Sequence, residues 1–477
     1  MRFIGRHQEL NILERMYNKE GFQMLVMYGR RRVGKTTLLS KFSEDKNPIF
    51  YTGIESKDDE NLRELGSTVF SYFNPGNAGV DFRSYADVVR FITSNIKADK
   101  TGSRHLIIID EYPYIAENAV EIASVLQREI DHEWKSLNIM LVLCGSSISF
   151  MEEEVLGEKS PLYGRRTGQM DLLPFDYLTA SEFVPVYSPE DKAVVYGITG
   201  GIPKYLASID PRLSLEENIV SQYFDASGYF YEEPKNLLRQ EFRDVALYFA
   251  ILNAIGNGCT KMSEIASKTG FDTSKVTQAL KKLEAVRIVK RDVPILNEKN
   301  KKLAQYVLMD GMFGFWFRFV SKAAMAIERG FGEQYYDNNV KPFIHDYMGQ
   351  IFETICQEYV LRTGMTGEYG RVLTQTGKWR GNDPIRKCPA DIDVVGIDAI
   401  SKSAVIGECK FKSTSFGKEE YETLMDHSRL ISPYIVEKYL IFSLSGVTKW
   451  VSEQDVPEVG FIPMEKLFSA DAPVVFR

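Results

Sequence analysis

Three short runs of apolar residues mark the first 150 residues of the chain. Residues 23–28, 106–109 and 139–143 are almost continuously apolar and have the length of β-strands. Such runs are typical of central strands in a parallel sheet, because helices cover both faces of that sheet. A helical pattern over residues 34–42 follows the first run. The alternation predicts an N-terminal α/β domain built on a parallel sheet.

The pattern changes beyond residue 180. It becomes helical and rich in Tyr up to about residue 240, with an interruption at Thr199-Gly200-Gly201-Ile202-Pro203. A compact helical segment follows, and a long amphipathic helix beyond Lys341 precedes a stretch with hairpin character. The sequence therefore predicts four domains, at residues 1–180, 181–240, 241–325 and 335–477.

Composition and charge exclude several classes of protein. The chain has 477 residues, of which 44% are hydrophobic, and a net charge of −7. These values suit a globular protein of about three domains, and any contact with nucleic acid must come from a local basic patch. No apolar run approaches the roughly 18 residues of a membrane span, and the N-terminus does not resemble a signal peptide. Five separated cysteines suit a reducing compartment and give no zinc-like spacing. We therefore expect a cytoplasmic protein without membrane contact.

Residues 29–36 form a phosphate-binding motif. Gly29-Arg30-Arg31-Arg32-Val33-Gly34-Lys35-Thr36 matches GxxxxGK(S/T) at every fixed position, between an apolar strand and a helix. The glycines let backbone N–H groups turn toward the phosphates, and the N-terminus of the helix adds positive potential. We expect Lys35 to bridge the β- and γ-phosphates of ATP, and the Thr36 hydroxyl to bind Mg²⁺. The alternative is a glycine-rich turn without a ligand.

The second and third apolar runs lead into polar side chains. Asp110 and Glu111 follow the second run, where unpaired buried carboxylates would be costly. A Mg²⁺ ligand at Asp110 and a base at Glu111 that polarises the attacking water give both acids a role. Two ordinary acids at an exposed strand end are the alternative. Ser146, after the third run, is either a sensor of the γ-phosphate or part of a plain turn, and Arg165-Arg166 is either an arginine finger or a solvated pair.

The order of these motifs, together with Phe3-Ile4-Gly5-Arg6 and Gly201-Ile202-Pro203, resembles the archaeal-type ATPases, P-loop proteins of the AAA+/STAND superfamily. The resemblance covers roughly residues 1–240. It implies that Gly5 and Arg6 lie near the nucleotide base, and that residues 201–203 are the element through which a helical lid responds to the nucleotide. It also implies a conformational switch with slow hydrolysis. The nucleotide-binding residues are then Gly5, Arg6, Gly29, Arg30, Arg31, Arg32, Val33, Gly34, Lys35, Thr36, Thr37, Ser146, Gly201 and Pro203.

Residues 259–291 carry the pattern of a helix-turn-helix followed by a wing. Ala266, Gly270 and Val276 stand where alanine lets two helices approach, glycine makes a left-handed turn and a branched residue fills the core. Between residues 261 and 291 there are eight Lys or Arg and three Asp or Glu, so the segment suits phosphate contacts. The alternative is a winged helix that only packs against neighbouring domains. The exposed face is predicted to carry Ser274, Lys275, Gln278, Lys281 and Lys282.

The C-terminal segment contains a predicted hairpin on which charged residues converge. A polar turn near Ser401 joins two apolar strands, so that the numbers of opposed residues sum to about 802. Asp393 then lies opposite the neighbourhood of Glu408 and Lys410, which share one face because side chains alternate; Asp391 shares the face of Asp393. Two carboxylates beside a lysine suit a Mg²⁺-dependent phosphodiesterase, in which the acids hold the cation and the lysine orients the nucleophile or the phosphate.

This D-x14-E-x-K pattern, with an upstream helix that carries Glu353, resembles the PD-(D/E)xK nuclease superfamily. The domain order, and Lys378-Trp379, also match a C-terminal domain of uncharacterised function that is often fused to such ATPases. Pro389 stands two positions before Asp391, which leaves open whether Asp391 or Asp393 binds the metal. Alternatives are a sheet edge guarded by charges, or a degenerate nuclease fold that binds without cutting. The resemblance assigns Glu353, Asp393 and Glu408 as metal ligands, and Asp393, Glu408 and Lys410 as catalytic residues.

Together these features predict a multidomain α/β protein with a P-loop NTPase parallel sheet, a helical lid, a winged helix-turn-helix and a C-terminal restriction-endonuclease-like domain. We hypothesise an ATPase switch that uses ATP and Mg²⁺, with Lys35 and Glu111 as its catalytic groups. It would bind DNA through the winged helix and the C-terminal domain and cleave it. Assembly into a homo-oligomer is compatible with this hypothesis. The competing hypothesis is a regulatory or signalling ATPase whose C-terminal domain is inactive and only binds partners or DNA.

Overall fold

The chain divides into two compact units in the computed structural model, which describes residues 3–56, 58–77, 79–369 and 372–469. The first unit is Met1–Pro174 with Ile202–Lys204, and the second is Phe175–Gly201 with Tyr205–Arg477. Met1 and Arg2, considered above for a signal peptide, and the last eight residues of the predicted C-terminal domain lie outside the described residues. In the described part of the chain, no helix has the length and apolar character needed to cross a membrane.

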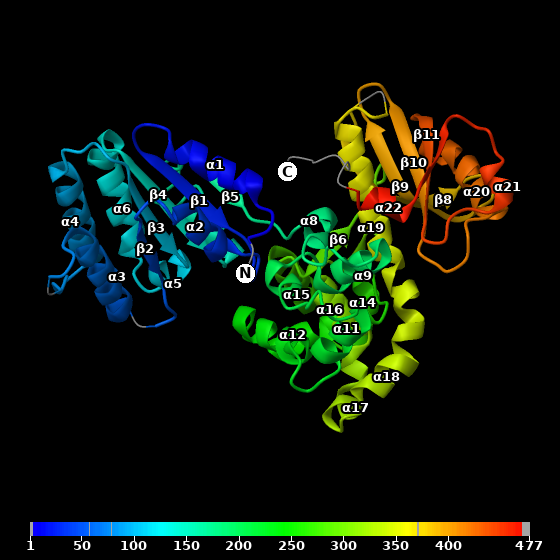
Figure 1. The fold of residues 1–477 in the computed structure, drawn as a ribbon, viewed down its shortest axis with the longest axis horizontal. Helices are drawn as coiled ribbons and strands as arrows, with labels where there is room; N and C mark the ends of the chain where they lie inside the picture. The colour runs from blue at the N-terminus through cyan, green and yellow to red at the C-terminus, as the bar shows by residue number, and fades with distance from the viewer. Residues whose placement is uncertain (1–2, 57, 78, 370–371, 470–477) are drawn as a thin grey trace. The chain divides into compact units, whose positions relative to one another are not determined.

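A five-stranded parallel sheet forms the centre of the first unit, in blue and cyan in Figure 1. Its strand order is β2-β3-β4-β1-β5. Every residue of β1, β3 and β4 is buried, as expected for central strands covered on both faces. The prediction of a parallel α/β domain from the three apolar runs is therefore confirmed. The strands are β1 (Gln23–Tyr28), β2 (Ile49–Thr52), β3 (His105–Asp110), β4 (Ile139–Gly145) and β5 (Gly168–Asp171).

Helices bury the two faces of this sheet. On one face, alternate residues such as Val26, Ile107 and Leu141 pack with α3, α4 and α6 in one apolar core. The residues between them, such as Leu25 and Val142, point the other way and are also fully buried. The helices are α1 (His7–Tyr17), α2 (Lys35–Ser43), α3 (Asp58–Phe73), α4 (Tyr85–Ala98), α5 (Tyr112–Ala116), α6 (Glu121–His132) and α7 (Ile148–Phe150).

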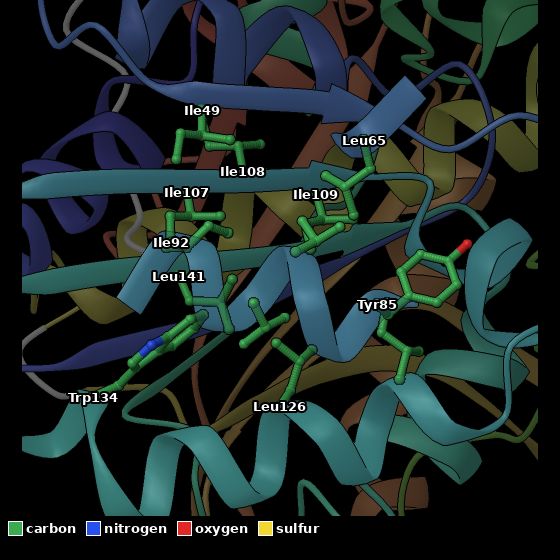
Figure 2. A pocket seen from close by; sticks show the side chains of 13 residues that line it. Ile49, Leu65, Tyr85, Ile92, Ile107, Ile108, Ile109, Leu126, Trp134 and Leu141 are labelled. Carbon is green, nitrogen blue, oxygen red and sulfur yellow. The ribbon is translucent and has the colours of Figure 1, made fainter. Parts of the chain in front are cut away.

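A small cavity lies in this core between the sheet and the helices α4 and α6 (Figure 2). Its volume is about 20 Å³, and side chains such as Ile92, Ile107, Leu126 and Leu141 line it. An apolar cavity of this size has room for about one water molecule but offers it no hydrogen-bond partners. It is a packing gap in the core and not a ligand site.

Helices make up the first part of the second unit. The helix α10 (Pro203–Leu206) begins in the first unit and ends in the second. Ser188 and Ser214 cap the N-termini of α9 and α11 by accepting hydrogen bonds from backbone N–H groups. The other helices of this part are α8 (Tyr177–Ser181), α9 (Pro189–Thr199), α11 (Leu215–Tyr223) and α12 (Tyr229–Glu241).

Three helices and a two-stranded antiparallel sheet follow, in the order that a winged helix requires. Gly270 ends the second helix in a left-handed conformation (φ 73°), and Val276 is fully buried, as the helix-turn-helix pattern predicts. Asp272 caps the third helix by accepting a hydrogen bond from the backbone of Lys275. We keep the winged helix as a prediction. Its elements are α13 (Val245–Gly256), α14 (Met262–Thr269), α15 (Thr273–Ala285), β6 (Val289–Asp292) and β7 (Gln305–Leu308).

The second unit ends in a sheet of order β12-β11-β10-β9-β8. The strands β8, β9 and β10 are antiparallel, whereas β10, β11 and β12 are parallel. Ser403 lies opposite Asp398 and Gly407 opposite Val394, one position from the predicted register. The strands are β8 (Gln375–Asp383), β9 (Cys388–Asp398), β10 (Ser403–Lys410), β11 (Ile435–Ser443) and β12 (Val459–Ile462).

Helices also surround this sheet. The 22-residue helix α19 packs along β8, β9 and β10 (Figure 1). The restriction-endonuclease-like fold remains a prediction for this domain. The remaining helices are α16 (Gly311–Arg318), α17 (Ala324–Glu328), α18 (Gly332–Asn339), α19 (Ile344–Met365), α20 (Lys418–His427), α21 (Lys449–Ser452) and α22 (Met464–Leu467).

Candidate nucleotide site and acidic cluster

The phosphate-binding loop joins β1 to α2 and encloses the Lys35 ammonium group. Lys35 is buried, and its Nζ donates to the backbone carbonyls of Gly29 at 2.8 Å and Arg30 at 3.1 Å. A Cβ on Gly29 would lie 2.4 Å from the carbonyl oxygen of Leu172, so no larger residue fits there. Gly34 precedes α2 in a left-handed conformation (φ 87°). The loop therefore has the backbone that the phosphate motif predicts.

Thr36 and Asp110, 74 residues apart in sequence, meet through their side chains. The Thr36 hydroxyl donates to Asp110 Oδ2 at 2.6 Å, and Asp110 is fully buried at the end of β3. The backbone N–H of Glu111 donates to the other Asp110 oxygen at 3.0 Å. Hydroxyl and carboxylate oxygens are the ligands that Mg²⁺ prefers, so these two residues fit the metal assigned to them.

Glu111, the predicted base, contacts Ser146, the predicted phosphate sensor. Glu111 Oε2 accepts two hydrogen bonds from Ser146, from its backbone N–H at 3.0 Å and from its hydroxyl at 2.8 Å. Ser146 is buried just beyond β4. The structure therefore brings the two together and points Ser146 at the carboxylate of Glu111, a contact that the sequence analysis did not foresee.

Arg6 fastens the phosphate loop from the side. Its Nη2 donates to the carbonyls of Val33 at 3.0 Å and Leu173 at 2.7 Å, and its Nη1 pairs with Glu9 at 2.8 Å. Gly5 and Arg6 both have left-handed backbones, with φ of 65° and 60°. These hydrogen bonds show that Arg6 supports the phosphate loop structurally. Its predicted position near the base of the nucleotide stays a prediction.

The remaining predicted arginines are engaged in different ways. Arg31 donates to the hydroxyl of Tyr114 at 2.9 Å. Arg165 pairs with Asp131 through two nitrogens and also donates to the carbonyl of Pro161 at 2.8 Å, whereas Arg166 is exposed. These contacts hold Arg165 against its own domain, which disfavours the arginine-finger alternative for that residue.

The Gly201-Ile202-Pro203 element is divided between the two units. Pro203 belongs to the first unit, where its Cγ lies 3.8 Å from the position of a Cβ on Gly34. The next residue, Lys204, donates from its backbone N–H to the carbonyl of Arg32 at 3.4 Å. Gly201 belongs to the second unit and has a left-handed backbone (φ 69°). Pro203 therefore lies beside the phosphate loop. The response of a lid through residues 201–203, which the resemblance implies, stays a prediction.

An acidic cluster in the second unit surrounds the side chain of Lys378. Its Nζ lies 3.0 Å from both carboxylate oxygens of Glu353 on α19, and 3.0 Å and 2.9 Å from Asp391 and Asp393 on β9. We call Glu353, Lys378, Asp391 and Asp393 the acidic cluster. The backbone holds it as well, because Asp393 Oδ2 accepts a hydrogen bond from the N–H of Cys409 at 3.1 Å.

Charge and burial shift the pKa values of this cluster. Burial and the neighbouring Asp393 raise the pKa of Glu353 to about 7, although Lys378 lowers it. Burial raises the pKa of Glu408 to about 9, and Asp393 and Asp391 add to this shift. Burial alone lowers the pKa of Lys378, but the surrounding carboxylates outweigh it, so this pKa lies well above its ordinary value. Glu408 therefore belongs electrostatically to the cluster, and Lys378 remains an ammonium group.

Lys410 does not take the place that the sequence predicts for it beside Asp393. Its Nζ pairs with the carboxylate of Glu420 at the start of α20 and donates to the carbonyl of Ser415 at 3.2 Å. Lys378 occupies the position beside Asp393 instead. The pairing of β8 with β9 shifts at this point, between Gly377 and Trp379. A bulge of this kind re-aims a side chain, and nothing in the sequence marks its position.

The acidic cluster fits a metal ion less well than the Thr36–Asp110 pair of the first unit does. Carboxylate oxygens suit Mg²⁺ chemically. Among the described residues, however, no group of three or more His, Cys, Asp or Glu side chains is arranged to hold a metal ion. Of the donors that the sequence assigns, Glu353 and Asp393 bind the Lys378 ammonium group instead.

The predicted nucleic-acid-binding face is exposed to solvent, whereas the predicted wing is packed against another part of the unit. Ser274, Lys275, Gln278, Lys281 and Lys282 are all exposed on α15, as predicted. The segment after β6, in contrast, binds the strand that carries Lys378. The N–H of Ile295 donates to the Lys378 carbonyl at 2.9 Å, and Asn297 Nδ2 donates to the Arg380 carbonyl at 2.9 Å. The segment that the sequence predicts to form the wing therefore packs against the C-terminal sheet.

Two protein-family models match separate segments of the chain. Residues 3–209 match the family model described as an ATPase domain predominantly from Archaea. Residues 316–423 match the model described as Archaea bacterial proteins of unknown function. These matches support the archaeal-type ATPase expected from the sequence, followed by a C-terminal domain of unknown function.

Individual relatives cover most of the chain. An uncharacterized protein of Methanocaldococcus jannaschii is 29% identical over 441 residues, which are 92% of this chain and 94% of the relative. An uncharacterized ATP-binding protein of the same organism is 22% identical over 339 residues, 62% of this chain and 90% of that protein. The Walker-type ATPase of Pyrococcus abyssi is 20% identical, and its structure matches 66% of this chain and 96% of its own with a TM-score of 0.49.

The contact between Ser146 and Glu111 leads to a prediction about catalysis. Ser146→Ala removes one of the two donors to the Glu111 carboxylate. A hydrogen bond to a charged group is worth about 1.5–3 kcal/mol, so we expect kcat for ATP to fall by about tenfold with little change in ATP affinity. Steady-state ATPase rates and nucleotide titration measure the two effects, with Ser147→Ala as the matched control. Weaker ATP binding at an unchanged kcat would instead assign the Ser146 hydroxyl to the phosphates.

The acidic cluster leads to a prediction about stability. Lys378→Met leaves three neighbouring carboxylates without their shared cation. Removing one partner of a fully buried pair costs about 3–5 kcal/mol; because the Lys378 side chain is 17% exposed, we expect about 2–4 kcal/mol of unfolding free energy to be lost. The Lys410 side chain is equally buried (16% exposed) but pairs with a single carboxylate, that of Glu420, which is 36% exposed. We therefore expect Lys410→Met to lose only about 1 kcal/mol or less. Urea unfolding at neutral pH compares the two, and equal losses would contradict a central place for Lys378.

Proposed function

We propose that this chain is an ATP-hydrolysing switch whose second unit binds DNA and cleaves it in the presence of Mg²⁺. The observation that carries the ATP-hydrolysing part of the proposal is the hydrogen bond between Thr36 and Asp110, which joins the phosphate loop to the acidic end of β3. The family match of residues 3–209 and the ATP-binding relative support this part alone. The four predicted domains, at residues 1–180, 181–240, 241–325 and 335–477, are part of the proposal.

In the proposed ATPase reaction, the phosphate loop and Lys35 hold the β- and γ-phosphates. Thr36 and Asp110 would hold Mg²⁺, which supplies positive charge at the phosphates. Glu111 orients the attacking water as a base, and Ser146 keeps its carboxylate in position through two hydrogen bonds. Pro203 lies beside Gly34, where a change in the loop would reach the chain that leads to the second unit.

In the second unit, we propose that the acidic cluster is the site of phosphodiester cleavage. Three carboxylates and one lysine from α19, β8 and β9 converge there, which is the set of side chains that such a site needs. Lys378 is our candidate for the lysine that orients the nucleophile or the phosphate, in place of Lys410. Glu353, Asp393 and Glu408 remain the candidate Mg²⁺ ligands.

A second function is favoured by the same geometry. The Lys378 ammonium group already hydrogen-bonds to the carboxylates that would have to bind a cation, and among the described residues no group of three or more His, Cys, Asp or Glu side chains is set to hold a metal. These observations favour a regulatory ATPase whose C-terminal domain binds partners or DNA without cutting.

Nicking of supercoiled plasmid decides between the two functions. With Mg²⁺ or Mn²⁺, we expect the wild type to nick DNA and Asp393→Asn and Lys378→Met to lose nicking by at least about 100-fold, because each loses an acid or the lysine of the site. Lys412→Met, an exposed lysine nearby, is the matched control. Agarose gel electrophoresis measures the products, and ATPase assays with Lys35→Ala as the inactive reference show that the first unit works.

Each outcome has a definite meaning. An intact plasmid together with normal ATP hydrolysis by the wild type would replace the nuclease by the binding-only function. Loss of nicking in Lys410→Met but not in Lys378→Met would restore the lysine that the sequence pattern indicates.

DNA binding through α15 is tested by salt dependence. Lys281→Ala with Lys282→Ala removes two exposed cations from the predicted face. Each lost phosphate contact lowers the slope of log affinity against log salt by about one, so we expect a slope smaller by about two and weaker binding to every sequence. Fluorescence anisotropy with duplex DNA measures this, and Lys97→Ala with Lys135→Ala in the first unit is the control. An unchanged slope would assign α15 to protein packing.

A further inference from the structure

The helix α19 contacts both segments through which the chain passes between its two units. The chain enters the second unit at Phe175, leaves it after Gly201 and returns at Tyr205. We call residues 175–177 and 197–201 the crossing segments. The first follows Leu173, which Arg6 holds, and the second leads to Pro203 beside the phosphate loop.

The first crossing segment is bound to α19 by a buried ion pair. Asp176 caps α8 by accepting the backbone N–H of Thr179 at 2.7 Å, and its Oδ2 pairs with Arg362 Nη2 at 2.6 Å. The Arg362 side chain is only 4% exposed, and the ring of Tyr177 lies 5.6 Å from its guanidinium group. Arg362 also pairs with Glu358 of its own helix at 3.2 Å. Separating Arg362 from Asp176 would remove one of these two carboxylates from a buried guanidinium group, so the ion pair favours movement of the segment together with α19.

The second crossing segment is bound to the other half of α19. The Tyr347 hydroxyl lies 3.0 Å from the carbonyl of Gly197 and donates to it. A Cβ on Gly197 would lie only 2.6 Å from the sulfur of Met348, so helix and segment touch without a gap. The two segments are also joined to each other, because the N–H of Phe175 donates to the Gly201 carbonyl at 2.8 Å.

Between these two attachments, α19 supplies parts of the acidic cluster. Glu353 binds the Lys378 ammonium group at 3.0 Å, and Gln357 Nε2 donates to the carbonyl of Asp393 at 2.7 Å. Tyr347 and Arg362 are 15 residues apart, about 22 Å along a helix. A helix is stiff over this length, so a shift of the crossing segments displaces Glu353 relative to β8 and β9.

We propose that Arg362 is a positioning residue through which the nucleotide state of the first unit controls the acidic cluster. The crossing segments carry the change to Arg362 and Tyr347, and α19 carries it to Glu353 and Gln357. The regulated site is the one proposed above for phosphodiester cleavage, and in that respect this inference rests on the proposed function.

Hydrogen–deuterium exchange of the full chain tests the coupling without any nuclease assay. We expect exchange in residues 350–360 to differ by about fivefold or more between saturating ADP and a non-hydrolysable ATP analogue with Mg²⁺, a ratio typical of coupled sites. Asp176→Asn keeps an N-cap acceptor but removes the negative charge that pairs with Arg362. We expect this variant to bind both nucleotides as the wild type does and to lose the difference.

Asp244→Asn is the matched control. Asp244 also caps a helix and pairs with a cation, Lys275, but at an exposed position away from α19. We expect it to keep the wild-type difference in residues 350–360. A full difference in Asp176→Asn, or equal exchange with both nucleotides in the wild type, would overturn the proposal.

The failure of this inference is separable from the failure of the proposed function. An intact plasmid with a nucleotide-dependent difference in α19 that Asp176→Asn abolishes would remove cleavage and keep the coupling. Nicking by a wild type whose α19 exchanges equally with both nucleotides would keep cleavage and remove the coupling.

Discussion

The ammonium group of Lys378 joins the elements that form the acidic cluster of the second unit. Lys378 contacts three carboxylates from two elements other than its own, Glu353 on α19 and Asp391 and Asp393 on β9. Three carboxylates at such short range would repel one another and resist ionisation without a shared cation. Lys378 therefore fixes the position of α19 against the sheet. Ile295 and Asn297, in the segment after β6 that is predicted to form the wing, also hydrogen-bond to the backbone of β8, the strand that carries Lys378.

The first unit follows the same rule with different donors. The buried Asp110 accepts the hydroxyl of Thr36, and the partly exposed Glu111 accepts both donors of Ser146, so each acid has a hydrogen-bond partner. These contacts join three strands of the sheet at the ends where a nucleotide would bind. In the coupling that we propose, a change of nucleotide alters these contacts, and the crossing segments, which are covalently continuous with the first unit, pass the change to α19 through Arg362 and Tyr347. According to this proposal, the crossing segments and α19 connect the nucleotide site to the acidic cluster.

The sequence predicts the strands and helices better than it predicts the contacts among side chains at the acidic cluster. The apolar runs at β1, β3 and β4 and the motif around Lys35 reveal the first unit, because burial and phosphate binding each leave a local pattern. The hairpin that carries Asp393 also leaves a local pattern, whereas Glu353 is indicated by the resemblance to the PD-(D/E)xK nucleases. The place of Lys378 among these acids leaves no such pattern, although Lys378-Trp379 contributes to the resemblance, because it depends on a bulge and on pairing across 15 residues with Asp393. The ion pair of Arg362 with Asp176 spans still more of the chain and has no local signal.

A double-mutant cycle between Lys378 and Asp393 tests the central claim most directly. The unfolding free energies of the wild type, Lys378→Met, Asp393→Asn and the double variant give the energy that the two side chains share. If Lys378 is the cation that holds the cluster, this coupling should reach about 1.5 kcal/mol or more, as for side chains in one buried network. Additive losses, within about 0.5 kcal/mol, would show that the two groups act independently and would contradict the account.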